Sequence, residues 1–300
     1  MFIDIHAHCY WQRVPFSNSW ANPEELIEIY DALDIERGCL LPVVSPEVYF
    51  PQSNEDILNM AAKYPDRFIP FCNVDPRAMA NSPKAQLERP LQYYKDMGCK
   101  GVGEVMPGLD VMDDRVQNLF ACAEKVGLPV TIELAHTRTN IFGMYDDPGL
   151  PGLEITLQRH PELVIFGHGP VFWSELSILG TPAERGVAFR LTGGQCGRLP
   201  KGPLLGEGVV PKLFRRYPNL MGDLSDGTPL NMFMRDEDYA AKFINEFQDR
   251  LFFGTDYCCM AIGTNIGMVP FLKKLRDTGK ISEEVFNKVA RENAIRLLNL

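Results

Sequence analysis

Four of the five histidines in this sequence lie at or just after the end of a strand-like run of apolar residues. His6 and His8 follow the first such run, and His136 and His168 follow two later ones. Side chains two positions apart on a strand point the same way, so the imidazoles of His6 and His8 can converge on one metal ion, at about 2.0–2.1 Å for zinc. An HxH pair alone is weak evidence, so the other strand ends decide its meaning.

Two carboxylates end strand-like runs in the same way. Glu104 lies in the sequence GEV, and Asp256 lies in the sequence GTD. Imidazole and carboxylate ligands together suit Zn²⁺, Mn²⁺, Fe²⁺ or Ni²⁺, and we expect one or two divalent ions, with zinc as the first expectation. The structural alternative is that these groups are only satisfied polar residues of the core. Burying four imidazoles and a carboxylate without an ion or a catalytic task is costly, which favours the metal.

The elements that must position these side chains alternate between strand-like and helix-like runs. Near-continuous apolar runs such as 67–74 and 163–167 are typical of parallel strands buried on both faces. The expected strands are 2–7, 36–44, 68–74, 101–105, 129–135, 163–167, 220–224 and 251–255, and the expected helices include 23–33, 54–63, 83–97, 113–126, 152–159, 209–216, 229–247, 266–277 and 282–298.

Eight such units predict a (β/α)₈ barrel, also called a TIM barrel, as a single domain over residues 1–300. In a parallel barrel the carboxyl ends of all strands open on one face, where His6 and Asp256 can meet. A doubly wound open sheet is the structural alternative, but it leaves these strand ends without a common meeting point. The long break at 170–218 is expected to form a substrate lid, with the glycine-rich stretch 192–197 as its hinge.

Composition excludes several other classes of protein. Lys and Arg total 30 against 39 Asp and Glu, a formal charge of −9, which disfavours nucleic acid as a partner. The eight cysteines show no CxxC spacing, which argues against a zinc ribbon or a disulfide framework. No apolar run reaches the roughly 18 residues of a membrane span, and the first residues do not read as a signal peptide. We therefore expect a cytoplasmic protein with a small-molecule substrate and no membrane partner; a homodimer is compatible with the sequence, although no patch specifies one.

The pattern of strand ends resembles the amidohydrolase superfamily, and its closest branch is the amidohydrolase 2 group. This group includes metal-dependent decarboxylases related to aminocarboxymuconate semialdehyde decarboxylase. The resemblance rests on the HxH, the single histidines after the fifth and sixth strands, the aspartate after the eighth, and the tail RENAIRLL at 291–298. It implies that His6, His8 and His136 bind the metal and that Asp256 binds it and exchanges a proton with its water. His168 then polarises the water in one-metal members, or binds a second ion in two-metal members, so the implied catalytic groups are Asp256 and His168.

Glu104 is the most informative residue of the set. Its GEV sequence is similar to the Gly-Glu signature of TatD-like metal-dependent hydrolases, which implies a carboxylate that bridges two ions, the second served by His136 and His168. The alternative is that Glu104 accepts a hydrogen bond and holds a ligand histidine in its tautomer. Asp223 and Asp226, near the seventh strand end, could support the site but also suit ordinary turns.

These observations predict a metal-dependent hydrolase that acts on a small polar metabolite, such as an amide, lactone or ester, through a metal-activated water. The leading alternative is non-oxidative decarboxylation of an aromatic or unsaturated carboxylic acid on the same scaffold. Two further alternatives are a TatD-like phosphodiesterase, which the negative charge disfavours, and a metal-binding barrel without catalysis. The substrate itself has no motif in the sequence.

Overall fold

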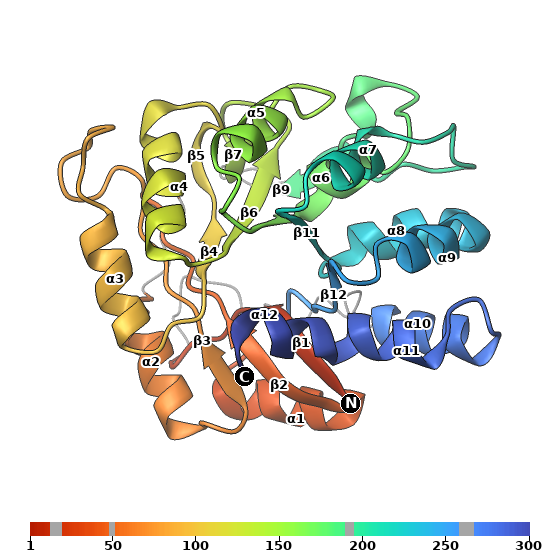
Figure 1. Ribbon diagram of the computed structural model, residues 1–300, viewed down its shortest axis with the longest axis horizontal. Helices are drawn as coiled ribbons and strands as arrows, with labels where there is room; N and C mark the ends of the chain where they lie inside the picture. The colour runs from red at the N-terminus through yellow and green to blue at the C-terminus, as the bar shows by residue number, and fades with distance from the viewer. Residues whose placement is uncertain (13–19, 48–51, 190–194, 258–266) are drawn as a thin grey trace.

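The computed structural model describes residues 1–12, 20–47, 52–189, 195–257 and 267–300, and every structural statement below concerns these residues. Eight parallel strands form a ring with helices around it, as the sequence predicted (Figure 1). In chain order the barrel strands are β1 (Phe2–Ala7), β2 (Ile35–Leu40), β3 (Phe68–Pro70), β4 (Val102–Val105), β6 (Val130–Ala135), β8 (Ile165–His168), β11 (Leu220–Asp223) and β12 (Leu251–Phe252).

Parallel pairing runs around the barrel and closes it. Ladders join β1 to β2 and β3, and a second series joins β4, β6, β8, β11 and β12. Two single parallel bridges complete the ring: Cys72 pairs with Val102 between β3 and β4, and Ala7 pairs with Tyr257 just after β12. The carboxyl ends of the strands therefore share one face of the barrel.

Side chains cap the first turns of several surrounding helices. Asn22 and Glu25 form a capping box at the start of the first helix, and Ser53 and Asp56 form one at the start of the second. The helices are α1 (Pro23–Leu33), α2 (Asn54–Lys63), α3 (Glu88–Asp96), α4 (Asp114–Val126), α5 (Pro151–Arg159), α6 (Gly169–Ser174), α7 (Val209–Arg216), α8 (Gly227–Arg235), α9 (Glu237–Glu246), α10 (Met268–Asp277), α11 (Glu283–Asn287) and α12 (Asn293–Leu298).

Three expected helices differ from the structure. The helix expected over 229–247 is two helices, because Asp236 has an extended backbone and its side chain caps α9 by accepting from the N–H groups of Asp238 and Tyr239. The helix expected over 83–97 begins only at Glu88. The C-terminal helix contains a π-helical segment, Lys288–Glu292, between α11 and α12.

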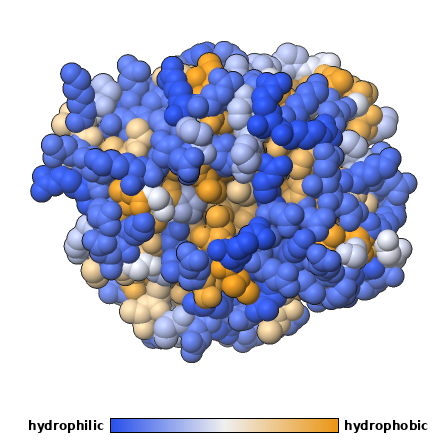
Figure 2. All heavy atoms as spheres, viewed as in Figure 1, coloured by the Kyte–Doolittle hydropathy of each residue, from blue (hydrophilic) through white to orange (hydrophobic). Residues whose placement is uncertain are grey.

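Two apolar layers hold the barrel together. The larger cluster packs the helices against the outside of the strands, with fully buried side chains such as Leu26 of α1 and Phe120 of α4. A smaller cluster joins Ile5 of β1, Phe166 of β8 and Phe252 of β12 across the ring, so it fills the barrel interior. Hydrophilic residues cover most of the outer face shown in Figure 2, where apolar residues form separate patches.

The longest connection between barrel strands joins β8 to β11. It holds α6, a 3₁₀ turn (Pro182–Glu184), an antiparallel hairpin of β9 (Gly186–Phe189) with β10 (Gln195–Arg198), and α7. The indole N–H of Trp173 donates to the carbonyl oxygen of Asp223 at 2.8 Å, which ties the connection to the end of β11. Residues 190–194, which include part of the expected hinge, lie outside the described residues.

Two further short strands extend the sheet: β7 (Gly143–Tyr145) pairs in parallel with the last residues of β6 and with β5 (Pro107–Asp110). Within the described segments, no helix has both the length and the apolar character needed to cross a membrane.

Candidate metal centre

The strand ends bring imidazoles and carboxylates together inside the barrel mouth. His6 and His8 come from β1 and the residue after it, Glu104 from β4 and His168 from β8. Asp256 follows β12, and its backbone N–H donates to the carbonyl oxygen of His6 at 2.7 Å. The four side chains from β1, β4 and β8 are at most 5% exposed, and that of Asp256 is 22% exposed. The centre is therefore buried, with Asp256 on its more open side.

Donor atoms of His6, His8 and Glu104 form the first group, and Asp256 lies beside it. The Nε2 atoms of His6 and His8 lie 3.1 Å apart. Glu104 Oε2 lies 3.7 Å from His6 Nε2 and 3.4 Å from His8 Nε2, and Asp256 Oδ1 lies 3.6 and 3.3 Å from the same two nitrogens. Ligands about 2.0–2.1 Å from a tetrahedral ion are about 3.3 Å apart, so these separations suit a single divalent cation.

A second group lies beside the first and shares Glu104. Glu104 Oε1 is 3.5 Å from His168 Nε2, and Glu133 Oε2 is 3.6 Å from that nitrogen. Glu133 belongs to β6, whose register with β8 pairs it directly with His168. These three donor atoms lie within 4.8 Å of one another, as do those of a third overlapping group, His6, His168 and Asp256.

The outer nitrogens of the three imidazoles all face acceptors that fix the rings. His6 Nδ1 lies 2.6 Å from Asp223 Oδ2, and His8 Nδ1 lies 2.8 Å from the carbonyl oxygen of Leu41. His168 Nδ1 lies 2.9 Å from Ser225 Oγ and 3.3 Å from Asp223 Oδ2. A carbonyl oxygen can only accept, so His8 Nδ1 carries its proton and Nε2 is left to face the centre. Such outer contacts are typical of metal-binding histidines.

The pKa shifts of the imidazoles and of Glu104 show that the carboxylates of the centre favour positive charge beside them. Burial opposes charge on His6, but the facing carboxylates of Asp223 and Glu104 outweigh it and hold the pKa of His6 well above its ordinary value. Burial is likewise outweighed at His8, whose pKa is raised to about 9 by Asp256 and Glu104. The pKa of Glu104 is held well below its ordinary value by the imidazoles, against burial. Protons thus supply the charge that a divalent cation would supply, and the residues fit a metal.

Asp4, a buried carboxylate outside the donor set, joins the first barrel strand to the segment after the last one. Asp4 Oδ1 accepts from the backbone N–H groups of His6 and Thr255, both at 2.9 Å. Asp4 Oδ2 accepts from the Thr255 hydroxyl at 2.6 Å and from the Tyr30 hydroxyl at 2.9 Å. These hydrogen bonds join β1 to the segment that carries Asp256, so Asp4 positions ligands from both ends of the chain.

The structure brings together five of the six residues singled out from the sequence, namely His6, His8, Glu104, His168 and Asp256. His136, by contrast, is half-buried one residue beyond β6 and belongs to none of the three groups of donor atoms found in the described residues. The physical reason is strand alternation: Glu133 and Ala135 share one face of β6, and position 136 falls on the other. Among the described residues, Glu133 is the β6 side chain that joins one of these groups, and the metal-binding role of His136 stays a prediction.

Sequence reasoning missed Glu133 and gave Asp223 only a supporting role among turn residues. Asp223 is fully buried, and although burial opposes its charge, the imidazoles of His6 and His168 hold its pKa well below the ordinary value. A Cβ atom at Gly169 would lie 1.8 Å from Glu133 Oε2, but the φ of +82° already favours glycine at this position, so Gly169 is no sequence signal for Glu133.

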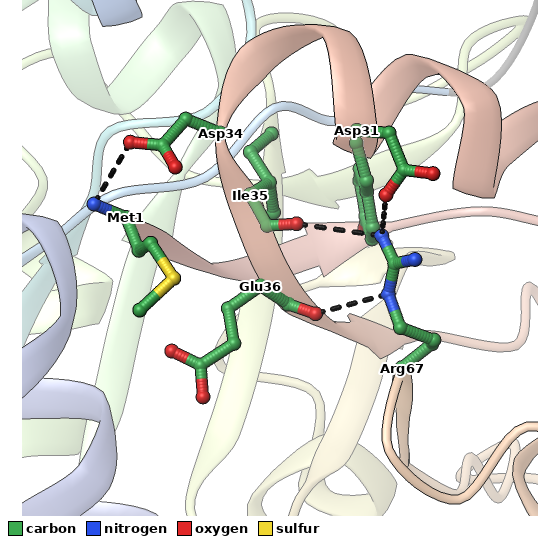
Figure 3. Close-up of a pocket in the computed structure, with 7 residues that line it drawn as sticks. Met1, Asp31, Asp34, Ile35, Glu36 and Arg67 are labelled. Carbon is green, nitrogen blue, oxygen red and sulfur yellow. Dashed lines mark hydrogen bonds and ion pairs between the residues drawn. The ribbon is translucent and has the colours of Figure 1, made fainter.

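A surface cavity lies away from this centre. It measures about 250 Å³ and lies at the start of β1 and β2, the end opposite to the strand carboxyl termini (Figure 3). Its charged groups already pair with one another: the terminal ammonium of Met1 lies 2.9 Å from Asp34, and Arg67 lies 2.8 Å from Asp31. The cavity therefore has no part in the chemistry of the strand ends.

The strands and helices form a (β/α)₈ barrel, and a cluster of imidazole and carboxylate donor atoms lies at the carboxyl ends of its strands. A family model described as Amidohydrolase matches residues 3–300, so the chain belongs to the amidohydrolase 2 family, whose members are enzymes. A comparison with curated proteins finds no matching sequence.

Solved structures share the fold at low sequence identity. An uncharacterised TIM-barrel protein from Bordetella bronchiseptica has a TM-score of 0.63 at 20% identity, covering 99% of this chain and 98% of its own. A probable 2-pyrone-4,6-dicarboxylic acid hydrolase from Acinetobacter baumannii has a TM-score of 0.60 at 14% identity, covering 100% and 99%. A 5-carboxyvanillate decarboxylase from Novosphingobium aromaticivorans, complexed with manganese, has a TM-score of 0.53 at 17% identity, covering 92% and 79%. At these identities the similarity establishes the fold alone.

Proposed function

We propose that this protein is a metal-dependent hydrolase that acts on a small, uncharged carbonyl compound such as an amide, lactone or ester. The observation that carries the proposal is the excess of carboxylates at the centre: Glu104, Glu133, Asp223 and Asp256 lie around three imidazoles. Burial and the neighbouring carboxylates raise the pKa of Glu133 well above its ordinary value, so Glu133 is not counted as ionised. The other three carboxylates offset the charge of one divalent ion, so a centre loaded with one ion has no net positive charge. A substrate carboxylate gains little attraction there, whereas water and a neutral carbonyl group can approach.

The roles of the residues follow from their positions. His6, His8, Glu104 and Asp256 are proposed to hold the divalent ion, with zinc as the first expectation. When bound, such an ion lowers the pKa of water and polarises a carbonyl group. Asp256, on the open side of the centre, accepts a proton from the attacking water and returns it to the leaving group. His168, fixed by Ser225 and Asp223, orients the water.

Decarboxylation of an aromatic or unsaturated carboxylic acid is the second candidate. It is supported by the decarboxylase among the solved structures that share the fold. It requires a cation near the barrel mouth to offset the substrate carboxylate. Phosphodiester hydrolysis of the TatD-like kind is the weaker proposal, because both the net charge of −9 and the carboxylate-rich centre repel a polyanion. We also propose that the connection 170–218 covers the substrate as a lid.

The test combines metal analysis with two substrate panels. Protein purified without chelators is analysed for metal, then assayed against neutral esters, lactones and amides, and against aromatic carboxylic acids with detection of CO₂. Asp256→Asn is expected to lower kcat about 10²–10⁴-fold, since it removes the proton acceptor. Asp249→Asn is the matched control, because Asp249 is 59% exposed and pairs with Lys288 on the barrel exterior.

The outcomes separate the two candidates. Turnover of a neutral carbonyl compound that depends on metal and on Asp256 supports hydrolysis. Release of CO₂ from an acid, with no hydrolysis, replaces the proposal by decarboxylation. A protein without bound metal, or an Asp256→Asn variant with wild-type turnover, overturns both.

A further inference from the structure

A small apolar cluster lies at the mouth of the barrel, separate from the two apolar layers that hold the barrel together. Its members, which we call the apolar wall, are Trp20, Val43, Met106 and Phe142. We propose that this wall binds a hydrocarbon or aromatic substituent of the substrate and thereby sets the specificity of the protein. The inference rests on the proposed function, because it concerns the carbonyl compound that the metal centre would hold.

The connections that follow the barrel strands supply all four members of the wall. Val43 lies after β2 and Met106 directly follows β4, while Trp20 and Phe142 lie in the connections after β1 and β6. These connections lie at the carboxyl ends of the strands, the same face on which the donor atoms of the metal centre are gathered. The wall and the centre therefore share one mouth of the barrel.

Ring contacts place the wall directly beside a proposed metal ligand. The ring centroid of Trp20 lies 5.1 Å from that of His8, with an angle of 49° between the ring planes. Tyr10 packs on the same indole, with ring centroids 4.7 Å apart. A substituent on a carbonyl group held near His8 is therefore within reach of the Trp20 ring.

A buried amide fixes the backbone beneath the wall. Asn73, which is 3% exposed, donates from Nδ2 to the carbonyl oxygen of Pro42 at 2.9 Å and to that of Glu104 at 2.5 Å. Val43 is next to the first of these carbonyl groups, and Met106 is two residues from the second. The two side chains at the base of the wall therefore have the same anchor as the backbone of Glu104.

Strand register brings the fourth member to the same place. Pro107 of β5 pairs with Gly143 of β7 in a parallel ladder, so the residues that precede them, Met106 and Phe142, are neighbours. Both belong to the same apolar cluster, which confirms the contact. The wall thus continues from the end of β4 to the segment after β6.

Burial divides the wall into a base and an outer surface. Val43 and Met106 are 3% and 6% exposed, whereas Trp20 and Phe142 are only partly buried. The two aromatic rings therefore keep apolar surface beside the polar donor atoms. Ligand pockets have this composition: apolar and aromatic side chains line them, and a few polar groups face the reacting atoms.

The other side of the centre has a polar lining. Glu104 Oε1 faces His168 there, and Glu133 Oε2 lies 3.6 Å from the same imidazole without a hydrogen-bond partner among the described residues. An apolar group on this side would cover buried polar atoms, which is costly. The apolar substituent is therefore expected on the His8 side, and the polar part of the substrate on the His168 side.

The experiment compares two metal-chelating probes that differ only in their apolar group. Acetohydroxamic acid and benzohydroxamic acid present the same pair of oxygen atoms to a metal ion, but one carries a methyl group and the other a phenyl ring. Each is titrated by calorimetry into protein loaded with Zn²⁺. Because the phenyl ring can bury more apolar surface, we expect benzohydroxamic acid to bind the wild type at least about tenfold more tightly.

Variants of the wall show whether this preference arises there. Phe142→Ser removes apolar surface and should lower the ratio of the two affinities at least about threefold, and Met106→Ala should do the same at the base of the wall. Phe142→Leu keeps an apolar side chain and should restore most of the ratio. Tyr93→Ser is the matched control, because Tyr93 is an aromatic residue of α3 that is 56% exposed on the barrel exterior, and it should keep the wild-type ratio.

The outcomes separate the wall from the proposed function. If the wild type binds acetohydroxamic acid but shows no preference for the phenyl ring, the wall is overturned and the proposed function stands. A wild-type ratio in both Phe142→Ser and Met106→Ala, or an equal loss in Tyr93→Ser, also overturns the wall alone. If the Zn²⁺-loaded wild type binds neither probe, no metal ion is accessible to a substrate, and the proposed function and the wall are overturned together.

Discussion

Replacement of Asp223 by asparagine tests whether the outer acceptors prepare the centre for metal. Asp223 Oδ2 lies 2.6 Å from His6 Nδ1 and 3.3 Å from His168 Nδ1, while Oδ1 accepts from the backbone N–H of Ser225 at 2.9 Å. Asparagine has one acceptor oxygen for these donors. The amide NH₂ group would replace the second acceptor oxygen, so it would face either an imidazole N–H or the backbone N–H of Ser225, and neither can accept from it.

The magnitude follows from the number of imidazoles affected. Loss of an outer partner of one ligand histidine typically costs about 10–100-fold in metal affinity. Asp223 supports two imidazoles, so we expect the upper end for Asp223→Asn, about 100-fold or about 2.7 kcal/mol at 1.36 kcal/mol per decade. The charge on the carboxylate adds to this effect, because it raises the basicity of both rings.

Competition with a chromophoric chelator at fixed pH measures the affinity, and thermal unfolding with and without Zn²⁺ measures the fold. Asp146→Asn is the matched control, because Asp146 is a buried aspartate that accepts from the N–H groups of Gly152 and Leu153 at the start of α5, away from the imidazoles. We expect this control to lower Tm and leave metal affinity unchanged. An Asp223→Asn affinity within threefold of the wild type would refute the reasoning.

Two further predictions concern protons and the closure of the barrel. In the metal-free protein the pKa of His8 is about 9, so a metal must displace its proton at lower pH. Apparent Zn²⁺ affinity should fall at least tenfold per unit as the pH is lowered from about 9 to 7, and a flat profile by chelator competition would contradict this. Thr255→Val removes the 2.6 Å hydrogen bond to Asp4, and we expect urea unfolding of the metal-free protein to show a loss of about 1–3 kcal/mol, whereas Thr278→Val at the exposed end of α10 should lose less.

The fold was predictable because its signals are local. Apolar runs buried on both faces alternate with amphipathic helices, and the boundaries of α1, α2 and α7 agree with the predicted ones. The break at Asp236 was missed because the apolar spacing continues across it, and only the extended backbone there shows that its side chain caps a new helix. Local periodicity alone does not reveal such a break.

The sequence predicted those site residues that can be recognised from a single strand. His6 and His8 share a face of the chain, and Glu104, His168 and Asp256 each end an apolar run. The choice between Glu133 and His136 depends on which face of β6 looks into the barrel. The pairing of Glu133 with His168 across two strands settles that face, and such non-local register has no local signature.

Asp4 and Asp223 each do two things: they orient proposed metal ligands, and they hold strands of the closed barrel together. Asp4 connects β1 with the segment after β12, and Asp223 at the end of β11 connects the imidazoles of β1 and β8. His6, His168 and Asp256 thus lie on strand ends that another buried carboxylate fixes. A cation that binds these ligands binds only the closed barrel, so its binding free energy adds to the stability of the fold. The carboxylates that orient the centre thereby couple metal binding to folding.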